Sequence, residues 1–241
     1  MKKMITAILS FDLCIGLLFL GFREKEILAA AAWKSNTEMA METGSRPPET
    51  MAAENEVVKK IALTFDDGPH PYYTEELLDG LKERGVVVTF FVTGEHASLH
   101  PDVIRRMQEE DHLIGNHTYS HMQLTNGNRE DFKEELIRTN EVIEGITGVE
   151  VEYVRPPYGT WDKSFEAELN MIPVLWTIDP LDWCSSNVGS ITDRIVKKAG
   201  ENEIILMHDY YDTSVTAALK AVDELLKEGY TFVTVEEILF E

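Results

Sequence analysis

The sequence predicts a parallel α/β fold, either a barrel or an open sheet. Two observations carry this prediction. Short runs rich in β-branched and aromatic residues alternate with longer amphipathic stretches, and reactive side chains follow the ends of several of those runs. With 241 residues, of which 44% are hydrophobic, the chain can bury a sizeable core in one domain with appendages.

Seven apolar runs are expected to form the strands of this fold. They comprise residues 60–65, 86–92, 113–116, 153–155, 173–176, 203–207 and 230–233. Amphipathic helices are expected over 74–84, 129–145 and 214–228, because large apolar side chains recur there on one face. Thr234, followed three residues later by Glu237, predicts a capping box at the start of a last short helix.

The charge balance excludes one class of partner. Aspartate and glutamate together number 43 against 22 lysines and arginines, so the formal net charge is -21. A surface of this sign repels a phosphate backbone, and we therefore expect no nucleic acid partner.

The N-terminus differs from the rest of the chain. Lys2 and Lys3 precede an apolar stretch over residues 4–22, which is close to the roughly 20 residues that a membrane-spanning helix needs. Small residues at 29–32 offer a cleavage site instead. We therefore expect residues 1–32 to be a membrane anchor or a signal peptide; a buried core helix is the alternative. Either role places the rest of the chain outside the cytoplasm, anchored or secreted.

A polar segment with glycine and proline follows, and it predicts a flexible linker over residues 33–56. The folded domain is then expected to occupy residues 57–241. Cys14 lies in the apolar stretch and Cys184 in the domain, so we expect no disulfide between them, and Cys184 is expected to be a buried thiol.

Candidate catalytic side chains follow the predicted strands at their carboxyl ends. They are Asp66 and Asp67, then His117, Arg155, Asp179 and Asp182, and finally His208. The carboxyl ends of parallel strands share one face of a barrel or open sheet, so residues far apart in sequence converge there. The pattern thus predicts one site.

A metal site is predicted within this group. His117 and His121 are four residues apart, so one helical turn or a compact loop places both imidazoles on one side. Asp67 completes a three-ligand set with an open coordination position. Solvated or hydrogen-bonded histidines are the structural alternative. Two histidines and a carboxylate also match the facial triad of iron oxygenases, although nothing in the sequence indicates a dioxygen co-substrate.

Five segments of the chain resemble, in order, the motifs of carbohydrate esterase family 4, the NodB-type polysaccharide deacetylases. They are TFDDGP at 64–69, HTYSH at 117–121, RPPYG at 155–159, DPLDW at 179–183 and LMHD at 206–209. The resemblance implies a distorted (β/α) barrel with about seven parallel strands. It also implies hydrolytic removal of acetyl groups from an acetylated polysaccharide, without specifying which one.

The resemblance implies roles for the first residues of the set. Asp67, His117 and His121 resemble the ligands of a divalent metal, usually zinc and sometimes cobalt. Asp66 resembles the general base, which accepts the proton of the attacking water. Arg155 resembles the residue that pairs with this base and orients it.

Further roles follow from the same resemblance. His208 resembles the general acid that protonates the departing nitrogen, and Asp182 the carboxylate that orients it and raises its pKa. Tyr158 resembles the residue whose backbone N–H faces the developing oxyanion. Trp183 and Leu206 resemble the walls of the pocket for the acetyl methyl group, although core packing would also explain both.

Structural explanations also exist for some of these residues. Asp66 and Asp67 could simply shape the turn at Gly68, and Arg155 could form a surface ion pair. Asp209 is expected to secure its loop rather than to react.

Together these observations predict a metal-dependent deacetylase of N-acetylated glycans, with N-acetylglucosamine of peptidoglycan as the favoured substrate. Chitin oligosaccharides, N-acetylmuramic acid and, less favoured, O-acetyl groups of xylan are the other substrates considered. The alternative from another class is a glycan-binding module of the same fold that has no turnover.

Overall fold

Seven parallel strands form one curved sheet in the computed structural model, which describes residues 58–240. The strands are β1 (Lys59–Asp66), β2 (Thr89–Val92), β3 (Leu113–Asn116), β4 (Tyr153–Val154), β5 (Ile172–Pro173), β6 (Glu203–His208) and β7 (Tyr230–Val233). The predicted anchor or signal peptide over residues 1–32 and the linker over residues 33–56 lie outside the described residues.

The sheet almost closes on itself. Its strand order is β5-β4-β3-β2-β1-β6, and β7 pairs with the first half of β1. After β5 the chain crosses to the far edge: Val174 N donates to Val154 O (2.8 Å), and Leu206 N of β6 donates to Ile178 O (2.9 Å). Residues 174–178 thus connect the edge at β5 to the edge at β6, where Ile178 pairs with Ile205. The predicted distorted barrel is therefore confirmed.

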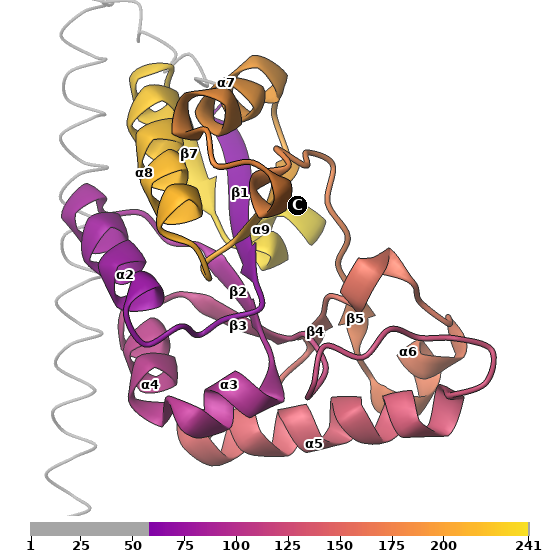
Figure 1. Cartoon of the computed structure of the whole chain (residues 1–241). Coiled ribbons are helices and arrows are strands. Elements are labelled where there is room, and N and C mark those ends of the chain that lie inside the picture. The colour runs from indigo at the N-terminus through magenta and orange to yellow at the C-terminus, as the bar shows by residue number, and fades with distance from the viewer. Residues whose placement is uncertain (1–57, 241) are drawn as a thin grey trace, which may run out of the picture. The chain divides into compact units, whose positions relative to one another are not determined.

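Helices surround the sheet, and several of them pack against one another (Figure 1). They are α2 (Tyr73–Arg84), α3 (Gly94–Leu99), α4 (Pro101–Glu109), α5 (Arg129–Thr147), α6 (Ser164–Leu169), α7 (Val188–Lys198), α8 (Asp212–Lys227) and α9 (Val235–Leu239). In Figure 1, α7 and α8 lie at the top of the domain and α5 runs along the bottom. Among residues 58–240, no helix combines the length and the apolar character needed to span a membrane.

Burial of both strands and helix faces explains why these segments fold as they do. The last six residues of β1 and all of β2 are buried, as expected for parallel strands covered on both faces. In α2, Leu77, Leu78 and Leu81 form the predicted apolar face and are fully buried, which stabilises the fold by about 1.5–3 kcal/mol for each side chain. Gly85 ends this helix in the left-handed conformation at φ 62°.

Two predicted strand boundaries are wrong by three residues, because backbone groups there bind elsewhere, and the other boundaries agree to within one residue. The second strand starts at Thr89 rather than residue 86, since Val86 N donates to Leu81 O in the closing turn of α2. The fifth strand ends at Pro173 rather than residue 176. The carbonyls of Val174 and Leu175 accept hydrogen bonds from the guanidinium of a buried arginine, which is described below.

Two smaller expectations also fail. Thr234 does precede the last helix, but its side chain makes no capping hydrogen bond, so the predicted capping box is not formed. Cys184 is exposed, not buried, because it lies in the short 3₁₀ segment Asp182–Cys184 on the surface loop after β5.

Candidate active site

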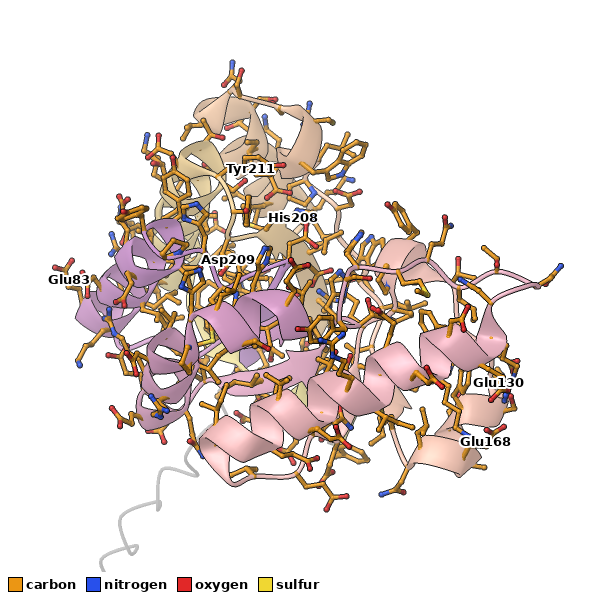
Figure 2. The ribbon with its side chains drawn as sticks, turned by 60° about the horizontal axis from the view of Figure 1, so that its bottom comes forward. Glu83, Glu130, Glu168, His208, Asp209 and Tyr211 are labelled. Carbon is orange, nitrogen blue, oxygen red and sulfur yellow. The ribbon has the colours of Figure 1, made fainter. Side chains whose placement is uncertain are left out.

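The candidate catalytic residues gather where the strands end. Asp66 is the last residue of β1 and His208 the last residue of β6, and these two positions pair directly across the neighbouring strands. His117 directly follows β3 and Arg155 directly follows β4. Figure 2 labels His208 and its neighbour Asp209 at the end of β6. The structure therefore brings together residues that lie up to 142 positions apart.

Asp67, His117 and His121 form a three-residue group with the spacing of a metal site. All three ligand atoms lie within 4.8 Å of one another, and Asp67 Oδ1 is 3.4 Å from Nε2 of each histidine. Asp67 Oδ1 is buried and has no hydrogen-bond partner. An unpartnered carboxylate oxygen between two imidazole nitrogens fits a bound divalent cation, so the residues suit the metal that the family resemblance implies.

The protonation pattern also suits a cation. His117 Nδ1 lies 2.7 Å from Arg155 O and must donate its proton to that carbonyl, which leaves Nε2 as the free ligand atom. Burial alone would raise the pKa of Asp67, but contact with His117 and the charges of His117, His208 and His121 lower it to about 2. The aspartate is therefore ionised, as a metal ligand must be.

The loops that carry the site hold unusual backbone conformations. Positive φ angles occur at Asp67 (76°), Thr118 (64°), His121 (58°), Tyr158 (60°) and Leu181 (60°). None of these residues is glycine, so each conformation costs of the order of 1–3 kcal/mol and must be maintained by the surrounding contacts. Such a concentration of strain at one place indicates loops shaped for a site rather than for stability.

The start of α3 joins the two loops that carry the metal group, a role that the sequence analysis missed. Three backbone amides donate to three carbonyls: Thr93 to Gly68 (3.1 Å), Gly94 to Thr118 (3.0 Å) and Glu95 to Tyr119 (3.0 Å). A side chain at Gly94 would collide with Tyr119, so glycine is required at this close approach. The pair Thr93–Gly94 after an apolar run was the available signal, because threonine there caps α3.

Asn116, the last residue of β3, supports the histidine loop and was also missed. Its Nδ2 donates to Leu136 O (2.8 Å) and to Asn140 Oδ1 (2.6 Å), while its Oδ1 accepts from Thr118 N (2.7 Å). The side chain is fully buried. A polar residue that ends a buried strand directly before His117 was the signal for this role.

Arg155 holds Asp66 in place. Its Nη1 donates to Asp66 Oδ1 (2.8 Å) and to Thr64 Oγ1 (2.5 Å), and its Nε donates to Val174 O (3.1 Å). The arginine is fully buried, so the alternative of a surface ion pair is wrong. The second oxygen of Asp66 lies 3.8 Å from His117 Nε2, so the carboxylate faces the metal-binding group.

Asp182 holds His208 by two contacts. Asp182 Oδ2 accepts the backbone N–H of His208 (2.8 Å), and Oδ1 lies 3.0 Å from His208 Nδ1. Burial alone would lower the pKa of His208, but the hydrogen bond to Asp182 and the charges of Asp182, Asp66 and Asp67 raise it to about 9. The imidazole thus retains its proton near neutral pH, with Nε2 directed away from Asp182.

The remaining predicted residues occupy different environments. Tyr158 is 66% exposed, and the edge of its ring meets His121 with 5.1 Å between centroids. Trp183 is 55% exposed, so core packing does not explain it, whereas Leu206 on β6 is buried. Asp179 accepts the N–H of Leu181 (2.7 Å) and stabilises its own turn, and among the described residues it has no hydrogen bond or ion pair with the other site residues.

A carboxylate held by an arginine, a histidine held by an aspartate and a three-residue group that fits a metal thus lie together at one end of the distorted barrel, an arrangement suited to metal-assisted hydrolysis. Residues 53–174 match the model of the polysaccharide deacetylase family, and the chain belongs to this family.

Two curated relatives from bacteria illustrate the similarity. The chain is 39% identical over 194 residues to the peptidoglycan-N-acetylmuramic acid deacetylase PdaC of Bacillus subtilis, covering 80% of this chain but only 41% of PdaC. It is 35% identical over 189 residues to a peptidoglycan-N-acetylglucosamine deacetylase of Bacillus cereus, covering 75% of this chain and 88% of the relative. The chain thus spans about two fifths of PdaC.

The fold is similar to that of a solved relative. The structure of the peptidoglycan deacetylase PdaC from Bacillus subtilis superposes with a TM-score of 0.73 at 39% identity. The match covers 76% of this chain and 91% of the solved chain.

Proposed function

We propose that the protein is a metal-dependent hydrolase that removes N-acetyl groups from a polysaccharide. The observation that carries this proposal is the pairing of Asp66 and His208 on adjacent strand ends beside the metal-binding group. Asp66 is held by Arg155 and His208 by Asp182, so a base and an acid have fixed positions around one reaction centre. Hydrolysis of an amide needs both.

Asp67, His117 and His121 would hold the metal, with zinc, cobalt or another divalent ion as the candidates. When bound, the ion would polarise the acetyl carbonyl and lower the pKa of water from 15.7 toward about 7. Asp66 accepts the proton of the attacking water through the oxygen that faces this group. Its other oxygen is bound to Arg155, which prevents the carboxylate from rotating.

His208 donates a proton to the departing nitrogen of the sugar. This step matters because an amine anion is a very poor leaving group. In the same proposal the backbone N–H of Tyr158 stabilises the oxyanion, and Trp183 and Leu206 border the acetyl methyl group. The exposure of Trp183 and the burial of Leu206 are compatible with the rim and the wall of such a pocket.

N-acetylglucosamine of peptidoglycan is the substrate that we favour. Support comes from the named activities of the relatives, because the Bacillus cereus protein is called a deacetylase of this sugar and PdaC one of N-acetylmuramic acid. Both sugars belong to peptidoglycan. N-acetylmuramic acid, chitin oligosaccharides and acetylated xylan are therefore the comparison substrates.

We also propose that the domain acts outside the cytoplasm. Residues 1–32 would anchor it to the membrane, or release it if they are cleaved, and residues 33–56 would serve as a tether. A tethered enzyme next to an immobile substrate gains a high local concentration. Fractionation of cells, with the mass of the N-terminus of the recovered protein, tests this arrangement.

Acetate release tests the function directly. The purified protein with added zinc should release acetate from one of the comparison glycans, and chelation of the metal should stop the release. A binding module would retain glycan and release no acetate at any metal concentration, and an oxygenase would consume dioxygen. Absence of acetate from every glycan would refute the proposal.

A further inference from the structure

Asp67 carries its metal-binding carboxylate on a backbone conformation that other parts of the chain must hold. Its φ is 76°, in the left-handed region that residues with a side chain rarely adopt. Within residues 58–240, its buried Oδ1 has no hydrogen-bond partner. The position of the carboxylate between His117 and His121 therefore depends on the contacts that the main chain of Asp67 makes.

The side chain of His96 makes the shorter of two contacts to this main chain. Its Nδ1 lies 2.7 Å from Asp67 O, whereas the hydroxyl oxygen of Thr93 lies 3.5 Å from the same atom. A carbonyl oxygen can only accept a hydrogen bond, so Nδ1 of His96 carries a proton and is the donor. This bond ties the turn of the metal ligand to a residue 29 positions further along the chain.

His96 belongs to a helix that is itself well anchored. The hydroxyl group of Thr93 caps α3 and accepts the backbone N–H of His96 (3.4 Å). Ala97, the next residue, is fully buried, and α3 packs against the long helix α5 (Figure 1). Backbone amides at the start of α3 bind both the turn of Asp67 and the histidine loop. His96 adds to this arrangement a contact through a side chain, which a substitution can remove.

His96 also contacts the loop after the proposed general acid. Its ring stacks on Tyr210 with 5.4 Å between centroids and 25° between the ring planes. Tyr210 follows His208 by two residues. The stacking restricts rotation of the imidazole, so the direction in which Nδ1 donates to Asp67 O is restricted as well.

We propose that His96 is a positioning residue for the metal. By donating to Asp67 O, it holds the turn in which the carboxylate of Asp67 meets both metal-binding histidines, and it acts through Asp67 rather than as a ligand. This inference rests on the proposed function and deepens it, because the metal affinity then depends on a residue outside the three-ligand group. Residues that orient metal ligands typically contribute about 10–100-fold to metal affinity.

Two substitutions separate the hydrogen bond of His96 from its stacking. His96→Asn keeps a donor, because the amide nitrogen can take the place of Nδ1, but loses the ring. His96→Phe keeps the ring and loses the donor. The zinc affinity of the full chain is measured by competition with a chromophoric chelator at pH 7.5. It should fall about tenfold in His96→Phe and stay within about threefold of the original value in His96→Asn.

Cobalt gives a second readout, which a change in folding stability alone would not alter. The visible absorption bands of bound Co²⁺ depend on the arrangement of its ligands. At saturating Co²⁺, the bands of His96→Phe should be shifted from those of the unsubstituted protein, whereas those of His96→Asn should coincide with them. Unshifted bands in His96→Phe would overturn the positioning role.

His100→Phe is the matched control, because it makes the same change at the end of the same helix. In the part of the chain that the structure describes, the ring of His100 has no hydrogen bond to the turn of Asp67. Zinc affinity and cobalt bands should therefore stay unchanged in this variant. A loss of affinity as large as that in His96→Phe would contradict the proposal.

Two further results would refute the role of the hydrogen bond: zinc affinity that is unchanged in His96→Phe, or equally weak in His96→Phe and His96→Asn. If His96→Phe does not fold, His96→Ala takes its place, and equal affinities of the alanine and asparagine variants would then refute the proposal. These measurements need no glycan, so they leave the acetate assay as a separate test of the proposed function. If the unsubstituted protein binds no zinc, the metal-dependent function itself fails.

Discussion

The hydroxyl group of Thr74 donates a hydrogen bond to the carboxyl group of Asp209, which joins the first turn of α2 to the loop after β6. Asp209 is fully buried, and a side chain at Gly68 would overlap its carboxyl group. Burial raises the pKa of Asp209 to about 7. The contact keeps the turn that carries Asp67 against the segment that carries His208.

Removing this donor should destabilise the protein. Thr74→Val keeps the shape of the side chain but leaves both a buried carboxyl oxygen of Asp209 and the backbone N–H of His70 without their partner, which should lower the free energy of unfolding by about 1–3 kcal/mol. Urea unfolding at pH 8 measures the change. Thr74→Ser retains the hydroxyl and is the matched control. Equal unfolding midpoints for the valine and serine variants would show that the contact is not important for stability.

Substitutions of Asp66 and Asp67 should have different effects on zinc binding, because only Asp67 lies against both histidines. Asp67→Ala should abolish binding of zinc, as measured by the metal content of the dialysed protein. Asp66→Asn should retain zinc and lower kcat by about 10²–10⁴, the usual contribution of a general base. A zinc-free Asp66→Asn protein, or a zinc-loaded Asp67→Ala protein, would contradict this assignment of roles.

Some of the site could be predicted because topology alone places it. The carboxyl ends of parallel strands lie at one edge of the sheet. Asp66, His117 and His208 therefore converge there, whatever the sequence of the segments that connect the strands. The strands over 113–116 and 230–233 have the predicted bounds, since each is a short apolar run that begins beside a glycine or a polar residue.

Other features leave little trace in sequence. The amides of Gly94 and Glu95 bind the histidine loop through the backbone, and any non-proline residue carries such a group. Thr74 and Asp209 lie 135 positions apart, and neither residue type indicates the other. The complete burial of Arg155 depends on carbonyls freed where β5 ends early, which local patterns did not predict.

Arg155 should contribute strongly to stability as well as to the site. Arg155→Ala would leave Asp66 buried without its partner and should lower the free energy of unfolding by about 3–5 kcal/mol. Arg155→Lys should recover only part of this loss, because an ammonium group cannot reach Asp66 and Val174 O together. Thermal unfolding followed by circular dichroism measures the series.

Arg105 provides the matched control. It forms an exposed ion pair with Asp102 on α4, so Arg105→Ala should cost at most about 1 kcal/mol. Comparable losses for Arg105→Ala and Arg155→Ala would indicate that burial of the pair with Asp66 has no special effect.

His112 should make the fold sensitive to acid. Its Nδ1 accepts the N–H of Val88 (3.2 Å), and burial lowers its pKa from 6.5 to about 4. Between these values the unfolded chain binds a proton that the folded protein does not. Stability is therefore complete above pH 6.5 and falls as the pH drops toward 4, by on the order of 3 kcal/mol.

His112→Asn should reduce this dependence, because its amide oxygen can replace Nδ1 as the acceptor but does not titrate. Unfolding in urea at pH 4.5 and pH 7.5 gives the two free energies for each protein. A difference as large in His112→Asn as in the unsubstituted protein would assign the acid sensitivity to other groups.

Asp182 should set the alkaline limit of activity. His208 acts as an acid only while protonated, and Asp182 contributes to raising its pKa to about 9. Asp182→Asn removes the negative charge, so the pKa of His208 should fall and the alkaline limb of kcat/KM should move to lower pH. Acetate release measured between pH 6 and 10 at constant zinc gives both profiles.

The same contact has an effect on stability with a definite sign. Because the pKa of His208 is raised on folding, its stabilising effect is complete below pH 6.5 and is lost as the pH rises through about 9. Asp182→Asn should therefore unfold more easily than the unsubstituted protein at pH 6, with a smaller difference at pH 10. Asp193→Asn, on the exposed face of α7, should change neither profile. An alkaline limb that stays in place in Asp182→Asn would mean that a group other than His208 protonates the leaving nitrogen.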